Sequence, residues 1–469
     1  MMSKKPILVL QMQRMGDLIL SFPLFLWLQR EYPGHPLWVV GEPRFYNELL
    51  RLSPPASYFP WTDTGALRTQ PFSLCINLSH EAKAAVLAGE VRAEQHIGAV
   101  QSADGVRHVY GNWQLYRTGL VHANRHNRYH WADLNALDCI PLARIRSTQW
   151  SEPRSCLGDR RRIGLFLGAS ESSKHPDADF WAGLARELLH RDLRPILLGG
   201  PGEKALAEAV RKGLGQNVLD LTNRLSLVQF AQLGQELELL ITPDTGPMHL
   251  ASWSGLRVLN LSLGPVNPWE TGPYQPGHFI LQARQSCSGC WRCTRFGVRP
   301  ICHEHFPPRR VALLAHALVN SAGISPQRLR WPGLELFASS RTRAGLYRLG
   351  PLRRNQATPM ARERLADFWS LFWGQLFGLW GRDKTLASWT DLVRAHPALA
   401  KAFVRFLLGF HRKLRQARES SFWSQGPPLL RPLFSHAHIV LQNGGFSRDS
   451  EREALKVTEE LLRIVSGEE

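Results

Sequence analysis

One stretch of the chain combines an acid, a hydroxyl, a glycine, a proline and a histidine directly after an apolar run. The segment Asp244–His249 reads D-T-G-P-M-H. Asp244 or Thr245 can cap a helix that begins here, and Pro247 suits its first turn. A helix N-terminus offers free N–H groups and a positive dipole end that bind phosphate, and Gly246 lets a ligand approach the backbone. The segment predicts a phosphate-binding helix start, with a plain capped helix as the alternative.

Three further polar clusters follow apolar runs in the same way. Asp17 comes after a glycine turn that follows the first run, and Gly168–Lys174 follows Ile163–Leu167. Glu203 comes after the G-G-P-G turn that ends the run Pro195–Leu198. Because the carboxyl ends of parallel strands meet at one edge of a sheet, such clusters are expected beside a cleft.

The elements that must position these residues form two successive series, and in each series short strands alternate with helices. Such alternation predicts parallel sheets with crossover helices, in two Rossmann-like lobes with a cleft between them. We place the lobes at residues 1–150 and 163–325, a Pro- and Arg-containing linker at 151–162, and a mostly helical extension at 326–469. The strands expected are Ile7–Leu10, Leu37–Val40, Leu74–Asn77, His96–Ala99, Ile163–Leu167, Pro195–Leu198, Val218–Leu221, Glu238–Thr242 and Arg257–Leu261.

Two regions outside this rhythm carry many polar or aromatic residues. The stretch Gln101–His130 has little periodicity, and we interpret it as loops that face the cleft. Two aromatic-rich helices are expected in the extension, at Leu365–Leu379 and Pro397–Arg415. Their aromatic side chains can pack on one another, pack on the lobes, or meet lipid beside nearby arginines.

The formal net charge of the chain is +18, and most of the cations are arginines. This charge suits phosphorylated or acidic partners, an anionic membrane surface or nucleic acid, and it also suits plain solubility. No apolar run reaches the roughly 18–20 residues that span a membrane. No export signal is apparent at the N-terminus, so we expect a cytoplasmic protein with reduced thiols.

Four ordered motifs resemble those of the heptosyltransferase family, glycosyltransferase family 9. These are G-D after the first strand (Met15–Leu18), the small-residue turn that ends in Lys174, the D-T-G-x-x-H segment, and G-P-V-N-P-W-E-T-G-P at 264–273. The resemblance spans roughly residues 5–325 and implies the two-lobed GT-B fold. The segment His175–Asp177 departs from the aromatic-Pro that the family places after the lysine, and the C-terminal extension has no counterpart in it.

The resemblance assigns Asp17 as the general base. A sugar hydroxyl has a pKa far above 7, so a positioned carboxylate or imidazole must take its proton as the hydroxyl attacks. The position of Asp17 also suits a helix cap, and His80 and His96 are weaker alternatives for the base.

The resemblance also implies how the donor is bound. Charge that develops on a leaving nucleoside diphosphate needs fixed donors. Lys174 is the prime candidate, and the remaining donor-site candidates are Ser170, Glu203, Asp244, Thr245, Gly246 and His249. Glu203 can accept ribose hydroxyls or stabilise a helix start, and His249 is expected at the phosphate or the donor sugar. Such enzymes work without a metal, so we expect no cofactor.

A cysteine cluster lies after the last motif. Cys287, Cys290, Cys293 and Cys302 have the spacing C-x2-C-x2-C-x8-C, with histidines nearby. They are candidate ligands for zinc or an iron–sulfur cluster. Because C-x2-C-x2-C is tight for tetrahedral zinc, we favour reduced loop cysteines without metal.

These observations predict an inverting glycosyltransferase that moves a sugar, a heptose by resemblance, from a nucleotide-diphosphate donor to a lipopolysaccharide-type glycolipid. ADP-heptose is the donor that the resemblance suggests, and the enzyme is expected at the inner face of the inner membrane. The alternatives are a GT-B enzyme with another nucleotide sugar or a protein acceptor, and a non-catalytic nucleotide-sugar binder. Nucleic acid is not expected as a partner, because aromatic–basic recognition motifs are absent.

Overall fold

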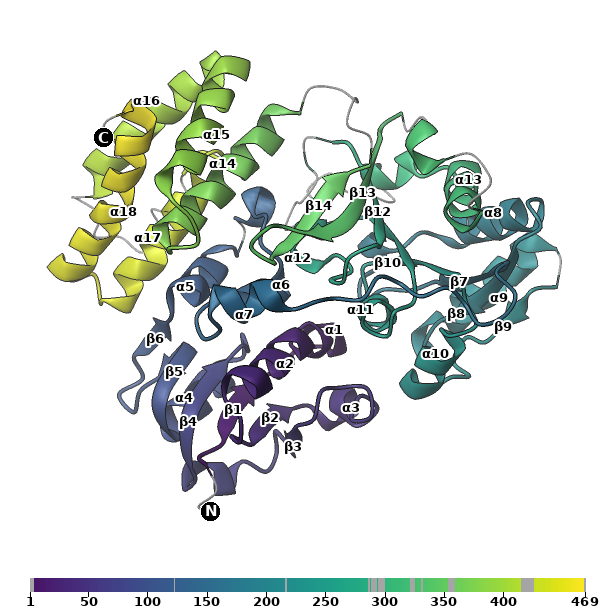
Figure 1. The fold of residues 1–469 in the computed structure, drawn as a ribbon, viewed down its shortest axis with the longest axis horizontal. Coiled ribbons are helices and arrows are strands. Elements are labelled where there is room, and N and C mark those ends of the chain that lie inside the picture. Colours follow the sequence, from purple (N-terminus) through teal and green to yellow (C-terminus); the bar gives the residue numbers. More distant parts are fainter. Residues whose placement is uncertain are drawn as a thin grey trace.

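The structure is a computed structural model, and we describe residues 4–121, 123–215, 217–285, 287, 293, 300–320, 325–329, 332–352, 359–414 and 426–467. Two sheets with helices around them form two lobes, and a group of helices lies against both (Figure 1). The two Rossmann-like lobes and the additional C-terminal helical region that the sequence predicted are confirmed.

The first lobe is built on a six-stranded sheet with the order β3-β2-β1-β4-β5-β6. Its strands are β1 (Ile7–Leu10), β2 (Leu37–Gly41), β3 (Ser57–Pro60), β4 (Pro71–Asn77), β5 (Arg92–Gln101) and β6 (Arg107–Tyr110). All neighbouring strands are parallel except β6, which is antiparallel to β5. The helices are α1 (Met15–Ile19), α2 (Phe22–Glu31), α3 (Pro43–Tyr46), α4 (Ala82–Glu90), α5 (Asn112–Gly119), α6 (Trp131–Leu134) and α7 (Leu142–Ser147).

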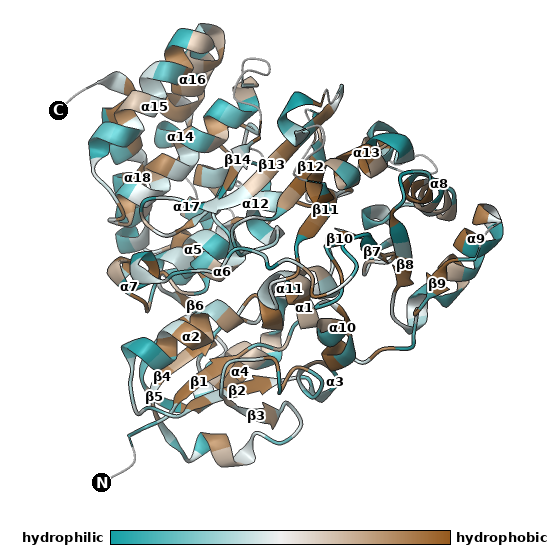
Figure 2. Ribbon diagram, turned by 45° about the vertical axis from the view of Figure 1, so that its right-hand side comes forward, coloured by the Kyte–Doolittle hydropathy of each residue, from teal (hydrophilic) through white to brown (hydrophobic). Residues whose placement is uncertain are grey.

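The second lobe is built on an eight-stranded sheet with the order β14-β13-β12-β11-β10-β7-β8-β9. Its parallel strands are β7 (Arg162–Phe166), β8 (Arg194–Leu198), β9 (Leu219–Asp220), β10 (Leu239–Pro243), β11 (Val258–Ser262) and β12 (Phe279–Ala283). The helices are α8 (Ala178–Leu189), α9 (Lys204–Leu214), α10 (Leu227–Leu233), α11 (Gly246–Trp253), α12 (Pro268–Thr271) and α13 (Pro308–Val319). The central strands of both sheets are mostly hydrophobic, as burial on two faces requires (Figure 2).

The second sheet continues past residue 325, where we had expected the lobe to end. An antiparallel hairpin of β13 (Leu334–Arg341) and β14 (Tyr347–Pro351) pairs with β12. Both faces of β13 contribute buried residues, Leu334 and Leu336 on one face and Phe337 and Ser339 on the other. A chain that ended near residue 330 would therefore lack two strands of this sheet.

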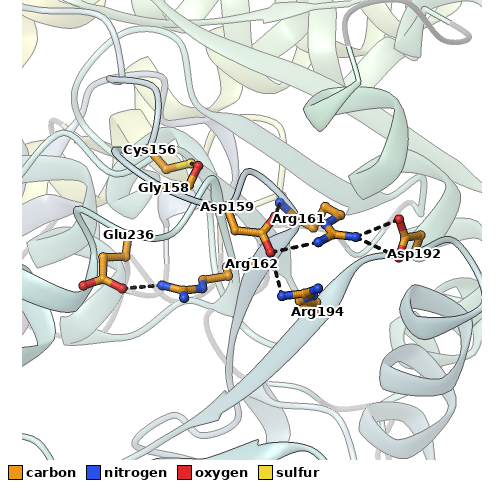
Figure 3. A network of polar contacts seen from close by, with 8 residues as sticks. All are labelled: Cys156, Gly158, Asp159, Arg161, Arg162, Asp192, Arg194 and Glu236. Carbon is orange, nitrogen blue, oxygen red and sulfur yellow. Dashed lines mark hydrogen bonds and ion pairs between the residues drawn. The ribbon is translucent and has the colours of Figure 1, made fainter.

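The linker is fastened to the second lobe. Its backbone donates from Arg154 to the Gly255 carbonyl and from Leu157 to the Gln235 carbonyl, both at 3.0 Å. Asp159 then forms ion pairs with Arg161 and Arg194, and Arg161 extends the network to Asp192 (Figure 3). Arg162, which begins β7, pairs with Glu236. The linker thus behaves as part of the second lobe rather than as a free tether.

The C-terminal region is helical and bridges the lobes. It consists of α14 (Ala361–Leu376), α15 (Arg382–Ala395), α16 (Pro397–Leu414), α17 (Arg431–Asn443) and α18 (Arg448–Ser466). Phe368, Trp369 and Phe403 are fully buried against one another. The ring of Trp373 lies 5.4 Å from that of Tyr116 in the first lobe. Most of these aromatics therefore pack together and on the first lobe.

The stretch 101–130 differs from our expectation of cleft-facing loops. It contains β6, α5 and a short 3-10 turn, Asn124–His126. Helix α17 packs against α5, and α14 packs against the turn, so this stretch lies between the lobe and the C-terminal helices (Figure 1). Partners on several sides bury polar side chains here, which removes the periodicity of a surface helix. Within the described ranges, no helix is both long and apolar enough to cross a membrane.

Candidate active site

The D-T-G-P segment forms the turn from β10 into α11, as its residue types predicted. Thr245 is the residue before the helix, and its side chain makes no capping hydrogen bond. Asp244 does not cap the helix either, because its Oδ2 accepts a hydrogen bond from the Thr271 hydroxyl at 2.7 Å. The first turn of α11 is therefore not closed by a side chain of this segment, and its positive end can face a ligand.

The first lobe meets this helix start through its own glycine turn. A Cβ atom on Gly246 would lie 2.4 Å from Cε of Met15, and one on Gly16 would lie 3.2 Å from Cδ2 of His249. The absence of side chains at Gly16 and Gly246 thus leaves room for this close approach of α1 to α11. It brings Asp17, in the first turn of α1, next to the D-T-G-P segment of the other lobe.

Asp17 is partly buried at this junction. Burial raises the pKa of its carboxyl, and Asp244 raises it further, while Arg117 and Arg14 lower it. A carboxylate with a raised pKa is a stronger base, which general base catalysis requires. The geometry is therefore suited to proton abstraction across the junction of the lobes.

Arg117, on α5, is a site residue that we did not predict. Its guanidinium donates to the Leu78 carbonyl at 3.1 Å and lies 4.5 Å from the Trp131 ring centroid. Burial lowers its pKa to about 10, and Asp17 acts in the opposite direction. The signal was missed because Arg117 lies within the stretch that we interpreted as loops.

The two alternative bases lie in different surroundings. Burial and Arg117 lower the pKa of His80 to about 4, so this imidazole is neutral at pH 7. His80 thus shares Arg117 with Asp17. His96 lies on β5, and its ring is next to Tyr110 on β6. This imidazole contacts Tyr110 and the Ala88 backbone, which are not site residues.

His249 and Asp244 face each other, with Nε2 of the imidazole 3.7 Å from Oδ1 of the carboxylate. Burial lowers the pKa of His249, while Asp244 raises it. Nδ1 of His249 is buried without a hydrogen-bond partner in the described part of the chain. This imidazole can orient a polar group of a ligand at the start of α11.

A cavity of about 300 Å³ lies at the carboxyl ends of β7, β8 and β10. It brings together Ser170, Glu203 and Thr245, three of the residues that the sequence predicted for the donor. Met15 of the first lobe closes one side. Apolar residues form the opposite wall, namely Phe166, Leu221, Leu225, Leu227 and Phe230. Apolar walls with a few polar groups at the edge are typical of nucleotide sites at strand ends.

Comparison with known proteins agrees with this geometry. Residues 64–296 match the family model described as glycosyltransferase family 9 (heptosyltransferase). The chain contains a glycosyltransferase family 9 domain. A curated relative, the lipopolysaccharide core heptosyltransferase OpsX of Haemophilus influenzae, is 21% identical over 298 residues, which cover 58% of this chain and 82% of the relative.

Solved structures show that the fold of this glycosyltransferase is that of the family. A glycosyltransferase family 9 protein of Veillonella parvula superposes with a TM-score of 0.52 at 19% identity, over 67% of this chain and 97% of the other. The ADP-heptose LPS heptosyltransferase II of E. coli superposes with a TM-score of 0.50 at 17% identity, over 67% and 98%. About a third of the glycosyltransferase lies outside these superpositions.

Glu203 of the glycosyltransferase lies at the cavity wall and also stabilises its own loop. Its Oε2 accepts a hydrogen bond from the Gly200 backbone N–H at 2.7 Å. Its side chain covers Gly168, where a Cβ atom would lie 2.2 Å from Oε1. The sequence left open whether Glu203 contacts a ligand or stabilises the start of a helix, and its position allows both.

Lys174 lies near the cavity but is not among the residues that line it. Its ammonium is 3.5 Å from Glu171, and Arg14 of the first lobe is 3.8 Å from the same carboxylate. Arg14 also donates to the Ser170 hydroxyl at 2.9 Å. Two cations from different lobes thus converge on the loop that precedes the donor cavity.

The loop of Lys174 rests on the G-P-V-N-P segment. Gly264 has a φ of +74°, which L side chains rarely adopt, and a Cβ atom there would lie 2.1 Å from the Ser173 carbonyl oxygen. The same carbonyl is 3.0 Å from Nε2 of His303. The glycine of this motif is therefore required by both its conformation and its contact.

The rest of that motif joins the two lobes of the glycosyltransferase. Asn124 and Asn127 of the first lobe donate to the two carboxyl oxygens of Glu270 at 2.9 and 3.0 Å. Burial raises the pKa of Glu270 to about 7. Nearby, the Tyr274 hydroxyl donates to Asp133 at 2.6 Å. We did not predict this network, because its partners are distant in sequence.

The cysteine cluster is described only in part. Cys290 lies outside the described residues, whereas Cys287, Cys293 and Cys302 are free thiols. The Gly264 N–H donates to Sγ of Cys302 at 3.3 Å, and burial raises the pKa of that thiol. Among the described residues, no three His, Cys, Asp or Glu side chains are placed to hold a metal ion. The absence of a metal stays a prediction.

Proposed function

We propose that this glycosyltransferase transfers a heptose, with inversion, from a nucleoside-diphosphate donor to a lipopolysaccharide-type glycolipid. The family domain supports the reaction class. The relative named as a lipopolysaccharide core heptosyltransferase and the fold neighbour named as an ADP-heptose enzyme support heptose and ADP. The observation that carries the proposal is the contact of α1 with α11, which places Asp17 of one lobe at the helix start of the other.

In the proposed reaction, the Asp17 carboxylate takes the proton of an acceptor hydroxyl. The hydroxyl oxygen attacks the anomeric carbon of the donor sugar, and the bond from that carbon to the diphosphate oxygen breaks. The electron pair leaves with the diphosphate, and attack opposite the leaving group inverts the configuration. The raised pKa of Asp17 favours the proton transfer.

The second lobe supplies the groups that bind the donor in this proposal. The nucleoside occupies the 300 Å³ cavity, with Glu203 at the ribose and the apolar wall at the base. The backbone amides at Thr245 and Gly246 and the ammonium of Lys174 stabilise the charge that develops on the diphosphate. Ser170, Asp244 and His249 orient the phosphates and the donor sugar.

A direct test is to offer the purified protein a panel of nucleotide sugars with a heptose-free lipopolysaccharide core acceptor. Mass spectrometry should detect an added heptose with ADP-heptose and should detect ADP as the second product. An added mass with a different donor would identify another nucleotide sugar, and addition to a protein but not to the glycolipid would change the acceptor. Binding of ADP-heptose without any product under these conditions would indicate a non-catalytic binder.

We also propose that the enzyme works in the cytoplasm and touches the inner face of the inner membrane through α15 and α16. These helices expose Leu386, Val393, Phe406 and Leu408 by more than a third of each side chain. Exposed cations accompany them on α16, namely Lys401, Arg405 and Lys413. Exposed apolar groups beside cations suit anionic headgroups, at about 1 kcal/mol for each cation.

Vesicle co-sedimentation tests this contact. The full-length protein should bind vesicles with anionic phosphatidylglycerol, and added salt should weaken the binding because it screens the charges. The double variant Arg405→Glu/Lys413→Glu should bind several-fold less than the wild type. Lys212→Glu/Arg309→Glu, which changes two exposed cations of the second lobe, serves as the matched control. Equal binding by all three proteins would remove the proposed membrane contact.

A further inference from the structure

A second and larger cavity, of about 760 Å³, lies outside the donor site. It is enclosed by the β13–β14 hairpin, by α14 and the start of α15, and by α12 of the second lobe. Figure 1 shows the hairpin at the edge of the second sheet that is nearest the C-terminal helices. The volume is within the range of small-molecule sites. The C-terminal region therefore does more than cover the lobes, because it completes this cavity.

Cations line the cavity from several elements. Arg343 lies in the turn between β13 and β14, Arg348 lies on β14, and Lys384 lies on α15. In the described part of the structure, none of the three makes an ion pair. A fourth cation, Arg128, is 3.3 Å from Asp367 and is only 15% exposed.

Three carboxylates also line the cavity, and two of them are paired, Asp367 with Arg128 and Glu363 with Arg362. The third is Glu335, so the lining cations remain in excess and favour an anionic ligand.

Two indole rings line the same cavity. The guanidinium of Arg128 lies 4.4 Å from the centroid of the Trp269 ring. The ammonium of Lys384 lies 5.4 Å from the centroid of the Trp380 ring. Flat aromatic faces suit the C–H face of a sugar ring, and the adjacent cations suit an acidic substituent on that sugar. The lining therefore matches a sugar that carries a phosphate better than it matches an uncharged or purely apolar ligand.

The cavity is also close to the reaction site along the chain. Trp269 lines it, while Thr271, two residues further in the same helix α12, donates to Asp244 beside the helix start of α11. Two residues span at most about 7 Å. Helix α12 therefore contacts the cavity through Trp269 and contacts Asp244, near the α11 helix start, through Thr271.

We propose that the cavity between the β13–β14 hairpin and the C-terminal helices binds a phosphorylated sugar of the acceptor. This inference rests on the proposed function for its choice of the acceptor, but its binding chemistry does not. The phosphate lies between Arg343, Arg348 and Lys384, and the sugar ring lies on the indoles. The lipid end of the acceptor lies outside the cavity.

Calorimetry with glucose 6-phosphate tests the proposal on the full-length protein. Saturating ADP is present throughout, so that the donor cavity is blocked. Glucose 6-phosphate should bind, whereas glucose and inorganic phosphate should each bind at least about 10-fold more weakly, because each lacks one half of the recognised chemistry. Failure of glucose 6-phosphate to bind, or equally tight binding of phosphate alone, would overturn the proposal.

The cavity is then tested by variants of exposed residues. Arg343→Ser/Arg348→Ser should weaken glucose 6-phosphate binding by about 10-fold or more, since each lost contact with a charged group is substantial. Lys212→Ser/Arg309→Ser, which removes two exposed cations of the second lobe, should bind as the wild type does. Equal affinities of the two variants would place the ligand elsewhere. Unchanged ADP affinity and melting temperature show that the variants are folded.

A separate assay keeps the two proposals apart. ADP release from ADP-heptose reports the transferase reaction and requires no glucose 6-phosphate. If glucose 6-phosphate does not bind but ADP is released in the presence of acceptor, the cavity proposal fails and the transferase stands. If glucose 6-phosphate binds in the expected manner but no transfer occurs, the cavity is a sugar-phosphate site and the proposed function fails.

Discussion

The two sides of the cleft are built on different physical principles. On the first-lobe side, one partly buried carboxylate, Asp17, interacts with the buried cation Arg117. On the second-lobe side, a cavity of about 300 Å³ combines an apolar wall, backbone amides and several polar side chains. A function that depends on one charged group is lost when that group is substituted. The binding free energy of a ligand held by many modest contacts changes little when one of them is substituted.

This difference separates turnover from binding. A group that acts only when the proton moves contributes to the transition state and little to the bound donor. Groups that hold the nucleotide contribute before and during the reaction. Substitutions on the first-lobe side are therefore expected to lower kcat, and those on the second-lobe side are expected to lower donor affinity.

The largest effect is expected from Asp17→Asn. The amide cannot take a proton, so kcat should fall by about 100-fold or more, the usual range for a lost general base. The affinity for ADP, measured by calorimetry, should stay within about 2-fold of the wild type, because a base that acts only in the transition state adds little to donor binding. A variant that keeps wild-type kcat would remove Asp17 from the role of base.

The pH profile gives a second measurement on the same residue. The base must be ionised, and burial raises its pKa above the ordinary 3.8. The rate of the wild type should therefore fall on the acidic side at a pH above 3.8. The residual rate of Asp17→Asn should lack this acidic limb. The same limb in both proteins would assign it to another group.

The contact between the lobes is expected to show the next largest effect, in stability rather than rate. Burial raises the pKa of Glu270 from 4.5 to about 7, so the folded state favours the protonated carboxyl. Protonated Glu270 therefore contributes its full share to the free energy of unfolding below pH 4.5, the pKa of the unfolded chain. This contribution is lost as the pH rises toward about 7, the pKa in the folded protein. Between about pH 5.5 and about pH 8, the wild type should lose about 2 kcal/mol relative to Glu270→Gln.

Urea unfolding at the two pH values measures that difference. The comparison uses the change with pH, because glutamine also loses one hydrogen bond to Asn124 or Asn127 at every pH. Glu208→Gln, an exposed acid on α9, is the control and should follow the wild type. Parallel pH dependence of wild type and Glu270→Gln would mean that Glu270 is ionised in the folded protein.

Lys174→Ala tests the second-lobe side with an intermediate effect. Its ammonium lies 3.5 Å from Glu171, and in the proposed reaction it contacts the diphosphate. Loss of a contact between a partly buried cation and phosphate should weaken ADP binding by about 10-fold. AMP, which lacks the second phosphate, should lose less. Calorimetry with both nucleotides measures this, and Lys212→Ala is the control. Equal losses for both nucleotides would place Lys174 away from the terminal phosphate.

Residues whose position depends on local chain order could be placed from the sequence. The turn before α11, Ser170 and Glu203 each follow an apolar strand of the second sheet, whose parallel topology brings them to one edge. Asp17 follows β1 of the first sheet in the same way.

Arg117 and Glu270 were not predictable in this way. Arg117 interacts with Asp17, which belongs to a different element, and Glu270 contacts Asn124 of the other lobe. These partners are distant in sequence, so no residue spacing predicts the contacts.

The end of the second lobe illustrates the same limit. Strand β13 pairs antiparallel with β12, and β14 pairs antiparallel with β13. The partner of a short strand depends on its tertiary surroundings, so the sequence of the strand does not predict it. The aromatic residues of the C-terminal helices left packing together, packing on the lobes and contact with lipid open, and only the structure shows that α14 and α17 pack on the first lobe. The 760 Å³ cavity follows from both of these contacts and had no sequence signal.

The smallest effect is expected from Glu203→Gln, which changes a single carboxylate on the second-lobe side of the cleft. The carboxylate already accepts a hydrogen bond from the Gly200 N–H at 2.7 Å, and glutamine can retain that bond through its own carbonyl oxygen. What glutamine loses is the second acceptor oxygen for ribose hydroxyls. Donor affinity should therefore fall by only about 3- to 10-fold, the scale of one hydrogen bond, and kcat should stay near that of the wild type.

Glu203→Ala separates the two roles of this residue, because it also leaves the Gly200 N–H without its partner. We expect alanine to weaken adenosine binding further and to lower the melting temperature, whereas glutamine should leave the melting temperature unchanged. The difference in affinity between the wild type and Glu203→Gln should be smaller for deoxyadenosine, which lacks a ribose hydroxyl, than for adenosine. If adenosine and deoxyadenosine distinguish the two proteins to the same extent, Glu203 only stabilises its loop, and the second-lobe side holds the nucleotide through the cavity wall and the backbone amides alone.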